Sequence, residues 1–278
     1  MAKISVIGIC GNSIFLTLDQ FHKPGETAVA TNCFEEIGGK GINQAIAAAR
    51  MGAEVSFLVA VGDDVHGNTC IAAMQAEGID GHFAVKPGQK TTFACILTDR
   101  SGENRVTVYR GAELCVEDVL AFEEQIAASD ILLLQQEVPP EVNETAITIA
   151  ARHEVKVILN PAPVRPFPDE LASQIYLATP NEHEQESIGH LPFQNRVVTL
   201  GEKGCLLNST EAIPAVPAEA VDTTGAGDTF NGVLAACLAE GMALVDACRY
   251  GVAAAGISVT RHGVLAAIPA RNEIERMM

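Results

Sequence analysis

Residues 41–78 read GINQAIAAARMGAEVSFLVAVGDDVHGNTCIAAMQAEG, and this stretch decides the fold. An Ala-rich run of helix formers ends at Gly52, an apolar strand follows over Glu54–Val61, and a second helix is expected over His66–Glu77. Upstream, the apolar run Ile4–Ile9 is expected to form a first buried strand. The order strand, helix, strand, helix is typical of a parallel β-sheet covered by helices.

The same pattern continues toward the C-terminus. Further strands are expected at Ile131–Leu134, Val155–Leu159, Ile175–Ala178 and Arg196–Leu200, and further helices at Val142–Arg152, Ala226–Ala239 and Leu244–Val259. We therefore predict an α/β fold with an open, mostly parallel sheet flanked by helices, forming a single domain over residues 1–278.

Two excursions, at about residues 11–36 and 91–110, interrupt this pattern with alternating sequence. In the first, residues 14–18 alternate and Thr27–Thr31 is extended again after Pro24-Gly25; in the second, Thr92–Thr98 and Arg105–Tyr109 are joined by the turn-rich segment DRSGEN. We predict antiparallel insertions that form a small β lid over the main sheet. On pattern alone, ordinary edge strands fit equally well.

The composition restricts the classes of partner. Eighteen basic and 35 acidic residues give a formal charge of −17, which disfavours nucleic acid and anionic membranes as partners. Eight cysteines occur without a C-x-x-C pair, which is typical of buried thiols in a reducing compartment. No apolar stretch is long enough to span a bilayer and no signal peptide is evident, so we expect a cytoplasmic protein.

The segment from Val221 to Leu234, VDTTGAGDTFNGVL, carries the strongest chemical signal. Small residues (Gly225, Ala226 and Gly227) open a predicted apolar helix, whose first N–H groups have no partner within the helix. Together with the helix dipole, these groups can stabilise a phosphoryl group during its transfer. Asp228 follows directly, where its carboxylate can accept a hydroxyl proton. The alternative is a tight turn followed by an ordinary acidic residue at a helix start.

A second glycine-rich segment, IGGKGINQA over residues 37–45, offers a cation and an amide beside flexible backbone. Lys40 supplies the charge, and Asn43 supplies two donors and one acceptor. Such a segment more often forms a glycine-rich turn with a solvated lysine, so the segment alone does not indicate a binding site.

Together these segments resemble the signatures of the ribokinase-like (phosphofructokinase-B-type) carbohydrate kinases. The N-terminal signature is matched by Gly38–Ala45 with Gly62–Gly67, and the C-terminal signature by Asp222–Asp228. Other matching strings follow in the family's order, namely PGET at 24–27, NPAP at 160–163, TPNE at 179–182 and VTRHG at 259–263. The resemblance covers nearly the whole chain and implies an ATP-dependent kinase that phosphorylates a hydroxyl of a sugar or related small molecule.

The resemblance also implies a role for individual residues. Asp228 is expected to be the general base, and Gly225, Ala226 and Gly227 to form the anion hole. The remaining expected contacts are Gly39, Lys40, Asn43 and Glu137 to the phosphate acceptor, Asn181 and Glu184 to Mg²⁺ and phosphates, Thr199 and Gly201 to the nucleotide, and Asp222, Thr224 and Gly263 to a monovalent cation such as K⁺.

The sequence departs from the family pattern at the acceptor site. Where ribokinases carry an aspartate that holds sugar hydroxyls, an ungapped count places Ser13, and a shift of register would place Asn12 in a similar role. Arg110 follows Tyr109 near the place where sugar-acid kinases of the 2-keto-3-deoxygluconate kind have a Tyr-Arg pair. We hypothesise that Ser13 and Arg110 contact the acceptor; the alternative for Arg110 is a solvated arginine on an edge strand.

Several functions therefore remain open on sequence alone. Within the kinases, the acceptor can be a sugar, a sugar acid or a nucleoside, and the need for K⁺ is undecided. An NAD(P)-dependent oxidoreductase is disfavoured because Gly8–Gly11 leads into alternating residues and not into a helix. A catalytically silent sugar-binding protein is disfavoured by the intact Asp228. The family's paired lid strands lead us to expect a homodimer.

Overall fold

Six parallel strands form the main sheet at the centre of the protein, in the order β10-β9-β8-β1-β4-β5. A computed structural model describes residues 1–101 and 103–278. The strands are β1 (Lys3–Ile7), β4 (Glu54–Gly62), β5 (Asp80–Lys86), β8 (Ile131–Gln135), β9 (Lys156–Asn160) and β10 (Leu177–Ala178). The predicted open parallel sheet is confirmed.

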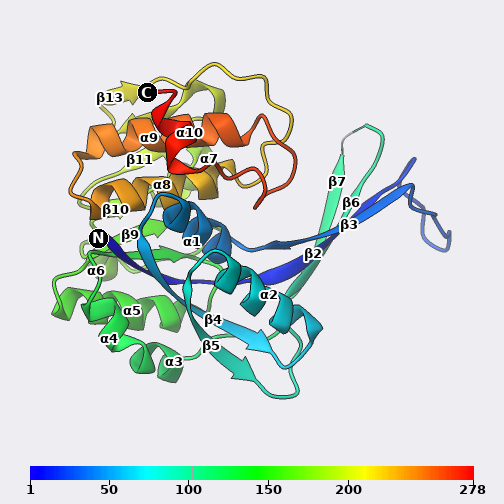
Figure 1. Cartoon of the computed structure of the whole chain (residues 1–278), viewed down its shortest axis with the longest axis horizontal. Coiled ribbons are helices and arrows are strands. Elements are labelled where there is room, and N and C mark those ends of the chain that lie inside the picture. The colour runs from blue at the N-terminus through cyan, green and yellow to red at the C-terminus, as the bar shows by residue number, and fades with distance from the viewer. Residues whose placement is uncertain (102) are drawn as a thin grey trace.

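Helices cover both faces of this sheet, as Figure 1 shows. One face packs against α1 (Lys40–Arg50), α2 (Val65–Ala76) and α8 (Ala226–Ala239), with α9 (Leu244–Ser258) on α8; the other packs against α3 (Val116–Ala121), α4 (Glu123–Ala127) and α5 (Pro140–Arg152). Shorter helical segments are α6 (Asp169–Ala172), α7 (Glu182–Ile188), the 3₁₀ turn Gly201–Lys203 and α10 (Arg271–Glu275).

The apolar strands of the main sheet are explained by burial on both sides. In β1, Ile4 and Val6 pack into the core with α1 and α8, whereas Ile7 packs into the core with α5. Because both faces are covered, the central strands β1, β4, β8 and β9 are mostly apolar and do not alternate with polar residues. Their carboxyl ends meet at one edge of the sheet, which is where ligands bind in open α/β folds.

The lid is a four-stranded sheet that projects from the body of the protein (Figure 1), in the order β3-β2-β6-β7. Its strands are β2 (Gly11–Thr17), β3 (Asn32–Gly38), β6 (Phe93–Thr98) and β7 (Asn104–Tyr109). The outer pairings, β2–β3 and β6–β7, are antiparallel, whereas the central β2–β6 pairing is parallel. The predicted turn between β6 and β7 includes Gly102, which lies outside the described residues.

One lid strand lies later in the sequence than predicted. The extended segment Thr27–Thr31 has no strand pairing over residues 27–30, and the partner of β2 is Asn32–Gly38. The polar pair Glu35-Glu36 and the glycines that follow concealed this strand. In its register Glu36 lies opposite Ser13.

A second small sheet lies beyond β10. It is antiparallel and consists of β11 (Val197–Thr199), β12 (Cys205–Leu207) and β13 (Glu211–Ile213). The strand predicted over Arg196–Leu200 belongs to this sheet, and it meets the end of the main sheet only through isolated bridges within the described residues. Its Thr199 lies beside Asn181, which brings two predicted site residues together.

Two further properties concern the cysteines and the helices. All eight cysteines have free thiols, five of them buried. Across residues 1–101 and 103–278, no helix combines the length and the apolar character needed to cross a membrane.

Candidate active site

The N-terminus of α8 is the focus of the site. Its N-cap, Gly225, has a left-handed φ of 75°, and a Cβ there would lie 2.6 Å from Val264 Cγ1, so both the backbone conformation and the packing favour glycine. Gly225, Gly227 and Asp228 line one cavity of about 370 Å³. The N–H of Ala226 donates a 3.3 Å turn bond to Thr223, so the amides near Gly227 offer the freer donors to an anion.

Asp228 is held by two amide side chains from α1. Asn43 Nδ2 donates to one carboxylate oxygen of Asp228 and Gln44 Nε2 to the other, both at 2.9 Å. Only 7% of Asp228 is exposed, and Gln44 is fully buried. Such a carboxylate is fixed in orientation before any ligand binds, which favours proton transfer at a defined position.

Lys40 and Glu137 form a second charged group beside Asp228. The backbone N–H of Lys40 donates to Glu137 Oε2 at 2.8 Å. Burial lowers the pKa of Lys40, but the carboxylates of Asp228, Glu137 and Glu184 raise that pKa above its usual value. Burial also raises the pKa of Glu137, against the opposing effect of Lys40. Lys40 therefore stays protonated at neutral pH, with its charge balanced by three neighbouring carboxylates.

Three cavities lie around Lys40, Glu137 and Asp228. The first, of about 190 Å³, lies under the lid and includes Glu137 and Arg110 in its lining. The second is the 370 Å³ cavity with Lys40 and Asp228. The third, of about 620 Å³, is lined mainly by apolar residues between the small sheet and α9 and shares Thr199, Gly201 and Gly227 with the second. The second cavity is therefore continuous in its lining with the third, and it is linked to the first through the bond between Lys40 and Glu137.

The predicted nucleotide residues lie around the second cavity. Asn181 caps α7 by accepting the N–H of Glu184 at 2.8 Å, and Glu184 Oε2 accepts the N–H of Asn181 at 2.9 Å. This capping box fixes Glu184 at the edge of the cavity. Burial raises the pKa of Glu184, with part of the effect cancelled by the N–H of Asn181 and by Lys40.

The predicted cation residues lie in a loop next to the α8 N-terminus. Asp222 accepts the N–H of Thr224 at 2.9 Å and that of Gly263 at 3.2 Å. Burial works to raise the pKa of Asp222, but these hydrogen bonds outweigh it and lower the pKa. The described residues contain no group of three or more His, Cys, Asp and Glu side chains suited to a metal ion, so a cation here needs carbonyl oxygens or ligand atoms as well.

The two lid residues proposed to contact the acceptor are placed differently. Arg110 lines the 190 Å³ cavity together with Arg165 and Glu137. Ser13 lies next to Gly38, a Cβ on which would be 3.4 Å from Ser13 Oγ, and Ser13 is absent from the described lining of that cavity. Asn12 lies on the opposite face of the strand from Ser13, where its Nδ2 donates to Glu35 at 2.7 Å.

Sequence analysis missed a layer of amides behind Asp228. Gln44 also donates to Asn160 Oδ1 at 3.1 Å and accepts from Gln135 at 2.8 Å. Asn231 accepts from Thr179 at 2.6 Å and donates to Gly227 O at 2.8 Å. Except for Gly227, each of these residues is buried. Buried amides inside otherwise apolar segments were the available signal, because such groups require specific partners.

Comparison with known proteins agrees with this geometry. Residues 1–271 match the family described as pfkB family carbohydrate kinase. The chain belongs to this family. The ribokinase of Haemophilus influenzae is 38% identical over 97% of this chain and 96% of its own length. The ribokinase crystal structure from Thermotoga maritima superposes with a TM-score of 0.90 and 36% identity, with 99% of each chain covered. A structure of Arabidopsis thaliana ribokinase complexed with ribose and ATP has a TM-score of 0.88 and 26% identity, over 100% of this chain and 99% of that one.

The pfkB-family chain is therefore an ATP-dependent kinase that phosphorylates a sugar hydroxyl. The fold also opposes the oxidoreductase alternative, because β1 leads through Gly8–Gly11 into lid strand β2 and not into a helix. Neither the sugar-acid nor the nucleoside alternative is favoured by these relatives.

Proposed function

We propose that the protein transfers the γ-phosphoryl group of ATP to a hydroxyl of a small sugar bound under the lid, with Asp228 as the general base. The acceptor hydroxyl loses its proton to Asp228 as its oxygen attacks phosphorus, and ADP leaves toward the 620 Å³ cavity. The amides at Gly225 and Gly227, with Lys40, stabilise the charge on the moving phosphoryl group.

The observation that carries this proposal is the position of Asp228 in the cavity that is linked to both of the others. Its carboxylate lines the 370 Å³ cavity, and Lys40 of the same cavity is bonded to Glu137 in the lining of the 190 Å³ cavity. An acceptor in the smaller cavity and a nucleotide in the larger one therefore approach one another at a carboxylate that is already oriented. This arrangement supplies proximity and a base together.

The acceptor is proposed as a sugar without a commitment to ribose. The Arabidopsis thaliana ribokinase structure is a complex with ribose and ATP, but here Ser13 stands where the family carries an aspartate for sugar hydroxyls. A serine hydroxyl cannot accept two hydrogen bonds from a diol as a carboxylate does. Arg110, on the cavity wall, offers a different contact.

We also propose Mg²⁺ and K⁺ as ions of the reaction. Mg²⁺ that travels with a nucleotide needs only one or two protein carboxylates, and Glu184 beside Asn181 meets this need. It would neutralise phosphate charge. For K⁺, the loop of Asp222, Thr224 and Gly263 offers a carboxylate with a lowered pKa and neighbouring carbonyls.

The assembly and location are further parts of the proposal. The lid exposes apolar side chains, with 46% of Phe34, 56% of Val106 and 55% of Val108 accessible, which supports a homodimer through paired lids. Eight free thiols support a reducing, cytoplasmic location.

A screen of acceptors tests the proposed function. ADP release is measured by a coupled assay with MgATP and, in turn, pentoses, hexoses, sugar acids and nucleosides, with and without K⁺. We expect at least one neutral sugar to raise ADP release well above the rate without acceptor. Equal ADP release with every compound would refute the proposal, and turnover with nucleosides alone would correct the acceptor class.

A further inference from the structure

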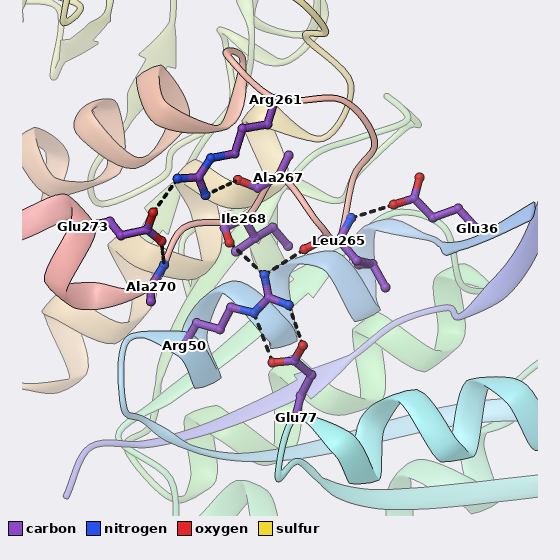
Figure 2. Close-up of polar contacts among 9 residues, drawn as sticks. All are labelled: Glu36, Arg50, Glu77, Arg261, Leu265, Ala267, Ile268, Ala270 and Glu273. Atoms are coloured by element: carbon purple, nitrogen blue, oxygen red, sulfur yellow. Dashed lines mark hydrogen bonds and ion pairs between the residues drawn. The ribbon is translucent and has the colours of Figure 1, made fainter.

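A carboxylate of the lid, that of Glu36 on β3, is bonded to the loop that follows α9. Glu36 Oε1 accepts the N–H of Val264 at 2.8 Å and that of Leu265 at 2.9 Å, and Figure 2 shows the bond to Leu265. Glu36 Oε2 is buried without a hydrogen-bond partner among the described residues. The side chain is therefore committed to this loop and not to solvent, through charge-assisted bonds that are stronger than neutral ones.

The loop that Glu36 binds lies against the N-terminus of α8. Val264 is buried, and its side chain occupies the space beside Gly225 in which a Cβ would lie only 2.6 Å from Val264 Cγ1. Its neighbour Gly263 donates its N–H to Asp222. A shift of this loop would therefore change the packing at the glycine that begins the helix.

The far side of the same loop is fixed to the body of the protein. Arg50 at the end of α1 donates to the carbonyls of Leu265 and Ile268, both at 2.7 Å, and its guanidinium is held by Glu77 (Figure 2). Arg261 pairs with Glu273 and anchors the start of the loop to α10. The loop thus connects a rigid anchor to a lid strand, with Val264 between them.

Glu36 also lies on the lid strand that leads directly to Lys40. In the strand register it is opposite Ser13, and four residues later the chain reaches Lys40 beside Glu137 and Asp228. We propose that Glu36 is a positioning residue that transmits the position of the lid over the acceptor to the N-terminus of α8. This inference rests on the proposed function, since it assumes that the acceptor binds under the lid.

The consequence is that an acceptor that holds the lid in place further stabilises the anion hole through Glu36. Glu36 should then raise the rate of sugar phosphorylation more than it raises the rate of ATP hydrolysis, because a water molecule in place of the sugar does not order the lid. A purely structural role, in which Glu36 only stabilises the loop, would affect both reactions equally. The ratio of the two rates separates these roles.

The kinetic test compares Glu36→Ala, Glu36→Gln and the matched control Glu35→Ala. Glu35 lies on the same strand and bonds to Asn12 on its other face. With the sugar of highest turnover from the screen above, we expect Glu36→Ala to lower the ratio of sugar phosphorylation to ATP hydrolysis roughly tenfold, a typical coupling between sites. Glu36→Gln keeps an acceptor oxygen and should restore most of the ratio, and Glu35→Ala should leave it unchanged. An unchanged ratio in a folded Glu36→Ala protein, or an equal loss in both rates, would overturn the proposal.

A second measurement needs no acceptor and separates failure of this inference from failure of the proposed function. Amide hydrogen exchange is followed in the free protein for all three variants. We expect Glu36→Ala to speed exchange over residues 262–266 and also over residues 223–229 at the α8 N-terminus, again with Glu35→Ala unchanged. Faster exchange confined to residues 262–266 would show a contact that does not reach the anion hole and would refute the coupling. If Glu36→Ala does not fold, Glu36→Ser takes its place in both comparisons.

Discussion

The N-terminus of α8 and the lid do their work by different physical means. At α8 the reacting carboxylate is buried, bonded to two amides and placed next to backbone N–H groups of a helix start. In the lid, the groups that face the acceptor lie on projecting strands, and Arg110 is exposed. The first region is determined by interior packing, whereas the second can change without disturbing the core.

This difference teaches where each part of the function resides. In the proposed function, phosphoryl transfer depends on the buried region, which matches its family string from Asp222 to Asp228. In the same proposal, acceptor choice depends on the lid, where Ser13 and Arg110 depart from the family pattern. Variants in the two regions should therefore differ in both the size and the kind of their effects.

The largest effect is expected from Asp228→Asn. Loss of the general base should lower the rate of sugar phosphorylation by about 10²–10⁴ while ADP still binds in the neighbouring cavity. Turnover is measured by coupled ADP release and ADP binding by calorimetry. The control is Asp246→Asn, which removes an exposed ion pair with Arg249 on α9. Full activity in Asp228→Asn would show that Asp228 is not the general base, and the buried region would then not supply the proton acceptor.

The next effect tests whether the amide layer behind Asp228 matters. Gln44→Leu removes the donor to Asp228 and to Asn160 and leaves buried acceptors unpaired. We expect the free energy of unfolding to fall by about 1–3 kcal/mol, measured by urea denaturation, with a loss of activity smaller than in Asp228→Asn. Gln75→Leu, on the exposed surface of α2, is the matched control. Equal stability of the two variants would show that this layer is not required.

Two carboxylates, one in each region, should contribute to folding stability with opposite dependence on pH. Asp222, by α8, has a lowered pKa because backbone N–H groups outweigh burial, so its stabilising effect is present above the unfolded pKa of about 3.9 and is lost as the pH falls through the folded pKa. Glu137, in the wall of the acceptor cavity, has a pKa raised by burial, so its contribution is full below about pH 4.3 and is lost as the pH rises through the folded pKa.

These signs predict how two variants compare with the native protein in urea unfolding between about pH 3 and 7. Asp222→Asn should be less stable at neutral pH, with the difference shrinking in acid. Glu137→Gln should gain relative stability as the pH rises, since a neutral amide avoids the burial of charge. The same trend in both variants would contradict the assignment of opposite shifts.

Much of the fold was predictable from the sequence, because the apolar runs of the main sheet and the helices α1, α5, α8 and α9 bury continuous surfaces. The two glycine-rich segments around Lys40 and Asp228 could also be identified as site segments from the sequence, since each combines glycines with a charged residue. Their meeting across 185 residues, through the bond from Asn43 to Asp228, required the structure.

The failures have physical reasons. Strand β3 was placed at Thr27–Thr31 because Glu35 and Glu36 do not resemble a buried pattern; they lie on opposite faces of an exposed sheet, and each bonds to a different part of the protein. The strand ending at Leu200 was assigned to the main sheet because an apolar run says nothing of its partner. Pairing between distant segments is a tertiary property that local sequence does not encode.

The smallest effect, expected from Arg110→Ala, tests the lid itself. Arg110 is exposed on the cavity wall, so water screens its contacts, and we expect its loss to raise the KM for the acceptor about two- to fivefold with little change in kcat. Arg105→Ala is the matched control, because Arg105 lies on the opposite face of the same strand with its guanidinium 4.0 Å from the centre of the Phe21 ring. An unchanged KM in Arg110→Ala would make Arg110 a solvated residue of the lid. A fall in kcat without a rise in KM would instead connect Arg110 to the chemistry at α8, and the separation of acceptor binding from phosphoryl transfer would then be incomplete.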